Sequence, residues 1–281
     1  MHLDAIDPDH PSALDDDEAA PPSGVPHGEA LREATAALHE RLRERQALLA
    51  ADGTRAVLVV LQGRDTSGKD GTIRDVFTAT NPQGVRVAAF AAPSTLERQH
   101  DYLWRVHAAV PPRGVIGIFN RSHYEDVLAV RARGLAPEAV WSRRYHHIAE
   151  FERMLVDEGT LVLKFFLHIS RDEQAERLRK RLAQPEKHWK FDEKDLEDRL
   201  RWGAYTAAYR DAFRHTSTPW APWYVVPADS KKVRNYLVAA TLVRALERLP
   251  LEPPRLEQAR LDALRGALEA QLAAEAAAAP G

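Results

Sequence analysis

Short apolar runs alternate with amphipathic stretches through most of this 281-residue chain. Five runs rich in Val, Ile and Phe lack the strict alternation of a half-exposed strand, which predicts strands buried on both faces. These runs are 55–62, 85–90, 115–120, 161–169 and 223–227. Helical patterns stand before, between and after them, at 29–52, 69–79, 95–109, 138–158, 171–183, 193–214 and 230–249. The alternation predicts one doubly wound α/β domain, in which helices flank a parallel five-stranded sheet.

The two ends of the chain differ from this middle part. Residues 1–28 contain seven acidic residues, five prolines and no Lys or Arg, which predicts a disordered acidic tail. Residues 251–281 are rich in Ala and Leu and predict a helical extension to which we assign no chemistry. We therefore expect the folded domain to span residues 29–250.

Composition narrows the class of protein. The chain has no Cys, which excludes disulfides, thiolate catalysis and Cys-ligated metals. It shows neither a secretory signal pattern nor a long apolar run, so we expect a cytoplasmic protein without a membrane partner. Because the acidic residues gather at the N-terminus, the rest of the chain is modestly positive, as suits an anionic ligand or nucleic acid.

The first candidate site is the segment 63–72, GRDTSGKDGT, which lies between a predicted buried strand and a predicted helix. Its G-x-x-x-x-G-K spacing directs backbone N–H groups and the positive end of a helix dipole toward one point, which suits a phosphate chain. The alternative is an ordinary strand-to-helix turn. The residues that we expect to contact phosphate are Gly63, Thr66, Gly68, Lys69, Asp70, Gly71 and Thr72.

Two acids in this loop call for a cation. Asp70 stands where most such loops carry Ser or Thr, and Asp65 lies inside the loop. Either carboxylate would repel a bound phosphate unless a cation lay between them, and Mg²⁺ binds few carboxylates together with waters and phosphate oxygens. We therefore predict that Asp65 and Asp70 bind Mg²⁺, with Mn²⁺ as an alternative ion. They could instead be turn and capping residues.

A second polar cluster follows the third predicted strand, in the sequence Asn120-Arg121-Ser122-His123-Tyr124-Glu125-Asp126. Ligands of parallel sheets bind beyond the carboxyl ends of strands, so this cluster should face the glycine-rich loop. Asn120 occupies the strand-end position where phosphate-transfer enzymes often carry a magnesium-bound Asp. Arg121 can hold phosphate oxygens with a bidentate fork, while Glu125 and Asp126 can hold water or metal or orient Arg121. We predict catalytic roles for Asp65, Lys69, Asn120, Arg121 and Glu125, against the alternative of an ordinary surface loop.

The third candidate is the charged region around 171–201, which Pro185 interrupts. Arg177 and Arg181 share one helix face, and Lys187 and Lys190 follow the proline. The pattern is typical of a mobile helical lid that brings cations over a phosphate chain. Because the segment is also rich in acids, a solvated helix pair fits its composition equally well.

Together, GRDTSGKDGTI, NPQGVRV, HDYLW, IGIFNRSHYEDV, KFFLHIS, PEKHWKF and APWYVVPAD, in this order, resemble the polyphosphate kinase 2 family over roughly residues 31–249. The resemblance implies a thymidylate-kinase-like P-loop kinase fold with a helical lid. It implies magnesium-dependent, reversible transfer of phosphate between inorganic polyphosphate and nucleotides. The form FNRSHYEDV is similar to the branch that phosphorylates both AMP and ADP.

Carried over by position, the resemblance makes Asp65 the essential acid of the loop and the lid cations the grip on polyphosphate. Arg64 and Ala91 depart from the pattern of that branch, so the preferred nucleotide stays open. The sequence also does not give the relative rates with AMP and ADP or the preferred length of polyphosphate. The family implies a homo-oligomer, a dimer or tetramer, and we expect adenine nucleotides rather than nucleic acid as partners. The alternatives are an ATP-dependent nucleotide or nucleoside kinase of the same fold, and a non-catalytic nucleotide- or polyphosphate-binding protein.

Overall fold

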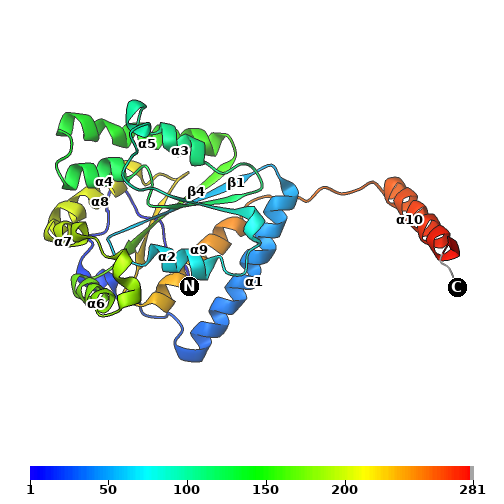
Figure 1. Ribbon diagram of the computed structural model, residues 1–281, viewed down its shortest axis with the longest axis horizontal. Helices are drawn as coiled ribbons and strands as arrows, with labels where there is room; N and C mark the ends of the chain where they lie inside the picture. The colour runs from blue at the N-terminus through cyan, green and yellow to red at the C-terminus, as the bar shows by residue number, and fades with distance from the viewer. Residues whose placement is uncertain (279–281) are drawn as a thin grey trace.

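A five-stranded parallel sheet forms the centre of the protein, as the sequence predicts (Figure 1). The computed structural model describes residues 1–278, and every side chain in that range except those of Lys190 and Ala278. The strands run in the order β2-β3-β1-β4-β5, and every pairing is parallel. Their bounds are β1 (Ala56–Gly63), β2 (Val85–Ala89), β3 (Ile116–Asn120), β4 (Thr160–His168) and β5 (Trp223–Pro227).

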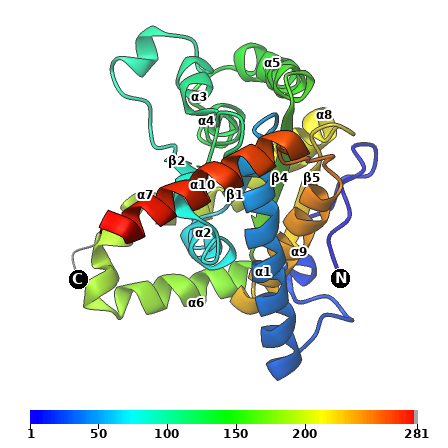
Figure 2. The ribbon, with the colours of Figure 1, turned by 90° about the vertical axis from the view of Figure 1, so that its right-hand side faces the viewer.

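Helices cover both faces of the sheet, so that the domain has three layers with the sheet in the middle (Figures 1 and 2). One face carries α1 (Gly28–Asp52), α2 (Lys69–Val76) and α9 (Lys231–Glu247). The other carries α3 (Trp104–Ala109), α4 (Glu125–Ala132), α5 (Glu138–Asp157) and α8 (Trp202–Thr216). Beyond the carboxyl ends of the strands lie α6 (Arg171–Leu182), the 3₁₀ turn η4 (Pro185–Lys190) and α7 (Glu193–Leu200). The other 3₁₀ turns are η1 (Asp16–Ala19), η2 (Pro82–Gly84) and η3 (Glu97–Gln99).

The central strand β1 explains why its sequence is apolar at successive positions. Each of its eight residues is buried. Val57, Val59 and Leu61 belong to the core beneath α1 and α9, whereas Leu58 and Val60 belong to the core beneath α5 and α8. Because alternate side chains of a strand point to opposite faces, a strand covered on both faces must be apolar throughout.

The structure corrects two expected helices and adds one that was not expected. The stretch 193–214 is two helices, which meet at Arg201 where ψ is 22°. In the stretch 95–109 only the 3₁₀ turn η3 and the short α3 form. Helix α4 was not predicted, because its first turn carries Glu125 and Asp126, which read as part of a polar loop.

The acidic N-terminal segment lies on the body, so the expected disordered tail is wrong for the structure described. Leu14, Ala19 and Val25 are buried. The backbone N–H of Ile6 donates to the Trp223 carbonyl at 2.8 Å, and that of Asp229 donates to the Ala19 carbonyl at 3.1 Å. Composition misled here because a few spaced apolar residues are enough to dock an extended segment that is otherwise polar.

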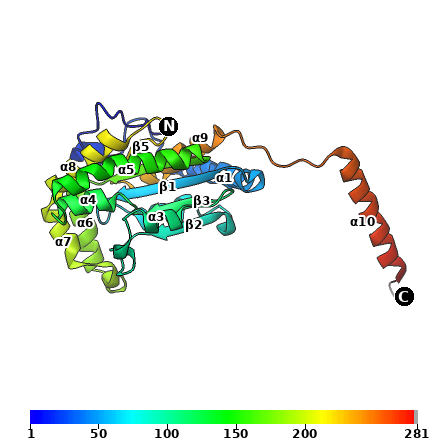
Figure 3. The same cartoon turned by 90° about the horizontal axis from the view of Figure 1, so that it is seen from above.

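Helix α10 (Gln258–Ala278) stands off the body on an extended connection, as Figures 1 and 3 show. The helix itself was expected, and its Leu264, Leu268 and Leu272 are exposed. Across residues 1–278, no helix is both long and apolar enough to cross a membrane.

Candidate active site

The glycine-rich loop joins the end of β1 to the start of α2, in the context that its sequence predicts. Thr66 has a φ of 66° and Gly68 one of 100°, both in the left-handed region. Alternation of left- and right-handed residues turns successive N–H groups to the same concave side, which makes an anion-binding nest. A Cβ on Gly63 would lie 2.5 Å from Ser67 Oγ and 2.9 Å from the Leu167 carbonyl, so glycine is required by the close approach of β4.

Lys69 is the first residue of α2 and is 8% exposed. Its Nζ donates to the carbonyl oxygens of Gly63, at 2.8 Å, and Arg64, at 3.4 Å. Burial lowers the pKa of Lys69 to about 8, and the neighbouring charge of Arg121 adds to the effect. The ammonium therefore lies within the loop without a direct carboxylate partner among the described residues, in an environment that an anion would improve.

The polar cluster after β3 faces this loop. Asn120 Nδ2 donates to Asp70 Oδ1 at 2.8 Å, and Arg121 Nη2 donates to Asp65 Oδ1 at 2.6 Å. Arg121 has a φ of 60°, an uncommon conformation for a residue with a side chain. Strand order explains the meeting, because β3 is the direct neighbour of β1. The sequence prediction that these two segments share one crevice is confirmed by these contacts.

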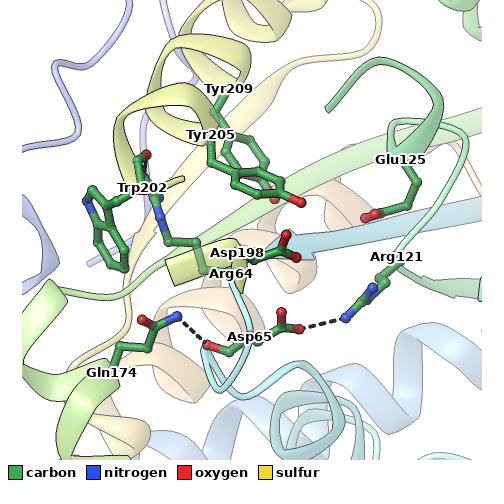
Figure 4. A pocket seen from close by; sticks show the side chains of 10 residues that line it. Arg64, Asp65, Arg121, Glu125, Gln174, Asp198, Trp202, Tyr205 and Tyr209 are labelled. Carbon is green, nitrogen blue, oxygen red and sulfur yellow. Dashed lines mark hydrogen bonds and ion pairs between the residues drawn. The ribbon is translucent and has the colours of Figure 1, made fainter. Parts of the chain in front are cut away.

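A pocket opens between the loop and the helices α4, α7 and α8 (Figure 4). Glu125, at the start of α4, lines it opposite Asp65 and Arg121. Burial raises the pKa of Glu125, although Arg121 and Lys69 act in the opposite direction. The remaining lining residues are Gly63, Arg64, Gln174, Asp198, Trp202, Tyr205 and Tyr209.

The acid Asp195 of α7 was missed by the sequence interpretation. It neighbours Asp65, and burial followed by the charge of Asp65 raises the pKa of Asp195 to about 6. Arg181 Nη1 donates to Asp195 Oδ2 at 3.0 Å. Two neighbouring carboxyl groups are a donor set suited to a divalent cation. The described residues hold no group of three or more His, Cys, Asp or Glu side chains around one point, so a cation here would need further oxygens from water or phosphate.

The predicted lid residues fall into different environments. Arg177 is buried on α6, and its donors meet protein oxygens: Glu173, and the carbonyls of Thr66, Ser67, Ala228 and Asp229. Lys187 is exposed on η4 and bonds to Gln184. The side chain of Lys190 lies outside the described residues. Gly71 and Thr72 belong to α2, where Thr72 is fully buried.

Arg64 connects the phosphate loop to helix α8, which follows the lid. Its guanidinium lies 3.9 Å from the centre of the Trp202 ring and donates to Thr206 Oγ1 at 2.6 Å. On α6, the first helix of the lid, Gln174 Nε2 donates to the Asp65 carbonyl at 3.2 Å. Sequence spacing gave no signal for these contacts, since the partners are more than 100 residues apart.

Ser122 and His123, which follow Arg121, are fully buried and do not line the pocket. His123 and Tyr124 instead enter a fully buried network with Glu152 and Lys164. Lys164 Nζ also donates to the Thr216 carbonyl at 2.7 Å. The network anchors the turn between Arg121 and Glu125 to α5 and β4.

A comparison with protein families decides the assignment of this arrangement. The family model "Polyphosphate kinase 2 (PPK2)" matches residues 27–252. The chain belongs to the polyphosphate kinase 2 family. It is 54% identical over 259 residues to the AMP/ADP-polyphosphate phosphotransferase of Meiothermus ruber, which covers 92% of this chain and 93% of that protein. It is 44% identical to the ADP-polyphosphate phosphotransferase of Rhodopseudomonas palustris, over 79% of this chain and 81% of that protein.

The fold agrees with the family assignment. The crystal structure of polyphosphate kinase 2 from Arthrobacter aurescens matches with a TM-score of 0.83 at 42% identity, covering 88% of this chain and 89% of that one. The P-loop kinase fold and the transferase class expected from the sequence are thereby confirmed.

Proposed function

We propose that this polyphosphate kinase 2 transfers phosphate reversibly between inorganic polyphosphate and adenine nucleotides, and that it accepts both AMP and ADP. The observation that carries the proposal is the facing pair of motifs, in which Arg121 from the end of β3 reaches Asp65 in the phosphate loop. Similarity to a relative named AMP/ADP-polyphosphate phosphotransferase over nearly the whole chain supports the choice of substrates.

Phosphate binding is assigned to the loop amides of Gly63–Thr72 and to Lys69. The Lys69 ammonium is held by two loop carbonyls, so it is positioned before a ligand arrives. Arg121 neutralises the transferring group from the opposite side, and Asn120 fixes Asp70 at the helix N-terminus. Catalysis by this set consists of positioning and charge neutralisation, because phosphoryl transfer requires little covalent help from the protein.

The residues present fit a divalent cation. In the structure Asp65 and Asp195 are neighbouring acids whose charges repel, and a cation between them would relieve that repulsion. We assign Asp65 and Asp195 to hold Mg²⁺ or Mn²⁺ together with phosphate oxygens and water, whereas Asp70, which the sequence also predicts as a ligand, is bonded to Asn120. When bound, the ion supplies positive charge to the phosphate groups. The chain's own part is to hold Asp65 between Arg121 and the α7 acid.

The lid supplies the binding surface for the polymer. Lys187 on the exposed turn η4, Lys190 in the same turn and Arg181 above Asp195 are proposed to attract polyphosphate. Arg177 is better assigned to the loop than to the polymer, because its guanidinium is already occupied by protein carbonyls. Attraction of a polyanion by exposed cations is screened by salt, so binding should weaken as ionic strength rises.

Product analysis tests the proposal. The purified chain is incubated with Mg²⁺ and long-chain polyphosphate plus AMP or ADP, and the nucleotides are separated. We expect ADP and ATP to form. Formation of product only when ATP is the donor would favour the ATP-dependent kinase, and binding without turnover would favour a non-catalytic binding protein. A homo-oligomer in the cytoplasm, with no nucleic-acid partner, is part of the same proposal and is checked by light scattering and cell fractionation.

A further inference from the structure

Two arginines lie behind the phosphate loop, on the side away from its N–H groups. Arg177 comes from α6 and Arg234 from α9, and neither helix belongs to the loop motif. The carbonyl oxygen of Ser67 accepts hydrogen bonds from both, at 3.2 Å from Arg177 Nη1 and 3.0 Å from Arg234 Nη1. Both acceptor positions of this one carbonyl are therefore taken by cations.

These two hydrogen bonds also fix the direction of the next backbone N–H in the loop. The bond between Ser67 and Gly68 is trans, so the N–H of Gly68 points opposite to the Ser67 carbonyl. With the carbonyl held by two guanidinium groups, that N–H is directed into the concave side of the loop. The packing is close: a Cβ on Gly68 would lie 2.0 Å from Arg234 Nη1.

Arg234 differs from Arg177 in the way its charge is balanced. Arg177 has Glu173 as a partner at 2.7 Å, whereas no described carboxylate forms an ion pair with Arg234. Its remaining donors reach the neutral side chain of Asn235, at 3.0 and 2.7 Å. The residue is 2% exposed, and burial followed by the charge of Arg177 lowers its pKa to about 10.

A buried cation without a counter-ion is costly to the folded protein. Neutral hydrogen bonds to Ser67 and Asn235 satisfy the donors of Arg234 but leave its charge unbalanced. A phosphate chain in the loop would provide negative charge on the far side of the Ser67–Gly68 peptide. The positive charge of Arg234, which destabilises the protein without ligand, would then stabilise the complex with phosphate.

We propose that Arg234 is a positioning residue for phosphate: it fixes the Ser67–Gly68 peptide from behind and adds a positive charge that acts on the bound phosphates through the loop. The inference rests on the proposed function, in that it assumes phosphate groups occupy the concave side of the loop. Arg234 itself touches neither substrate.

Binding of tripolyphosphate with Mg²⁺, measured by calorimetry over a series of salt concentrations, tests this role. We expect R234Q, which keeps a donor for Ser67 but loses the charge, to bind at least fivefold more weakly and with a shallower salt dependence. R234K, which restores the charge, should bind at least threefold more tightly than R234Q. R234M, whose side chain needs no partner, is the second neutral variant should R234Q fold poorly.

The controls separate this role from mere stability. R244M removes another arginine of α9, beside Tyr236 and Glu247 and away from the loop, and should bind as the wild type does. A loss of less than fivefold in R234Q and R234M, or no recovery in R234K, overturns the proposal even if melting temperatures fall. Absence of tripolyphosphate binding by the wild type would instead count against the proposed phosphate site.

Discussion

The charges of buried cations are balanced differently in two regions of this protein. Behind the turn at 122–124, Lys164 is fully buried against Glu152, with the Tyr124 hydroxyl and the Thr216 carbonyl completing its shell. At the phosphate loop, Lys69 and Arg234 are nearly as buried but meet mainly backbone carbonyls and an amide.

The difference separates structural charge from charge reserved for a ligand. Lys164 has its counter-ion inside the fold, so its charge is already paired in the folded protein and is not available to bind a ligand. Among the residues that the structure describes, no carboxylate forms an ion pair with Lys69 or Arg234, and burial lowers the pKa of both. They are held in place by neutral dipoles until an anion arrives, which is preorganisation in the electrostatic sense.

The largest expected effect is on the internally balanced pair. Glu152→Gln leaves Lys164 buried without a counter-ion, and breaking one side of such a pair costs about 3–5 kcal/mol of stability. Chemical denaturation followed by circular dichroism measures it. The double variant Glu152→Met with Lys164→Met should recover most of the loss, because neither charge then remains. A single variant as stable as the wild type would show that this pair is not a structural ion pair.

The next largest effect is at the phosphate loop, where we expect activity to fall much more than stability. Lys69→Met and Asp65→Asn should each remove more than about 3 kcal/mol of transition-state stabilisation, or over 100-fold in kcat/KM. Lys69→Met should leave stability near that of the wild type, because Lys69 bonds to loop carbonyls and not to a carboxylate. Asp65→Asn also removes the ion pair with the partly exposed Arg121, so its stability should fall by less than about 1 kcal/mol. Steady-state kinetics with polyphosphate and ADP, beside a melting curve, provide the check. Wild-type turnover in either variant would remove its proposed role.

A third substitution tests the closeness of Arg234 to the loop. Gly68→Ala places a Cβ against Arg234 Nη1 at a residue with a φ of 100°, so we expect a loss of about 1–3 kcal/mol in stability and weaker phosphate binding. Gly71→Ala is the matched control, since its Cβ would lie 3.4 Å from Arg234 Nη2 in a regular helix. Equal behaviour of the two variants would contradict the described packing.

The smallest expected effect is at the lid turn. Lys187 is exposed, and a single exposed charge contributes less than about 1 kcal/mol. Lys187→Ala should therefore raise the KM for polyphosphate only a few-fold at low salt, with kcat unchanged and the difference vanishing at high salt. Kinetics at two ionic strengths measure this, and Lys180→Ala on the outer face of α6 is a matched control. A large fall in kcat would assign Lys187 to the reacting centre.

Much of the fold was predictable because its signals are local. The sheet followed from five apolar runs, and the loop followed from glycines that only a tight strand-to-helix turn requires. The meeting of Asp65 with Arg121 could also be expected, since parallel strands end at one edge. The roles of the individual site residues stay predictions that the kinetics above would test.

Sequence alone thus determined the strands, the phosphate loop and the edge at which the chemistry lies, because backbone periodicity and glycine conformation are properties of neighbouring residues. Only the tertiary structure decided the surroundings of that loop. Asp195 meets Asp65 across 130 residues, and Arg177 and Arg234 reach the Ser67 carbonyl from helices over 100 residues away. Nothing in their local sequence distinguishes them from other charged residues, since the balance of a buried charge depends on what the fold packs around it.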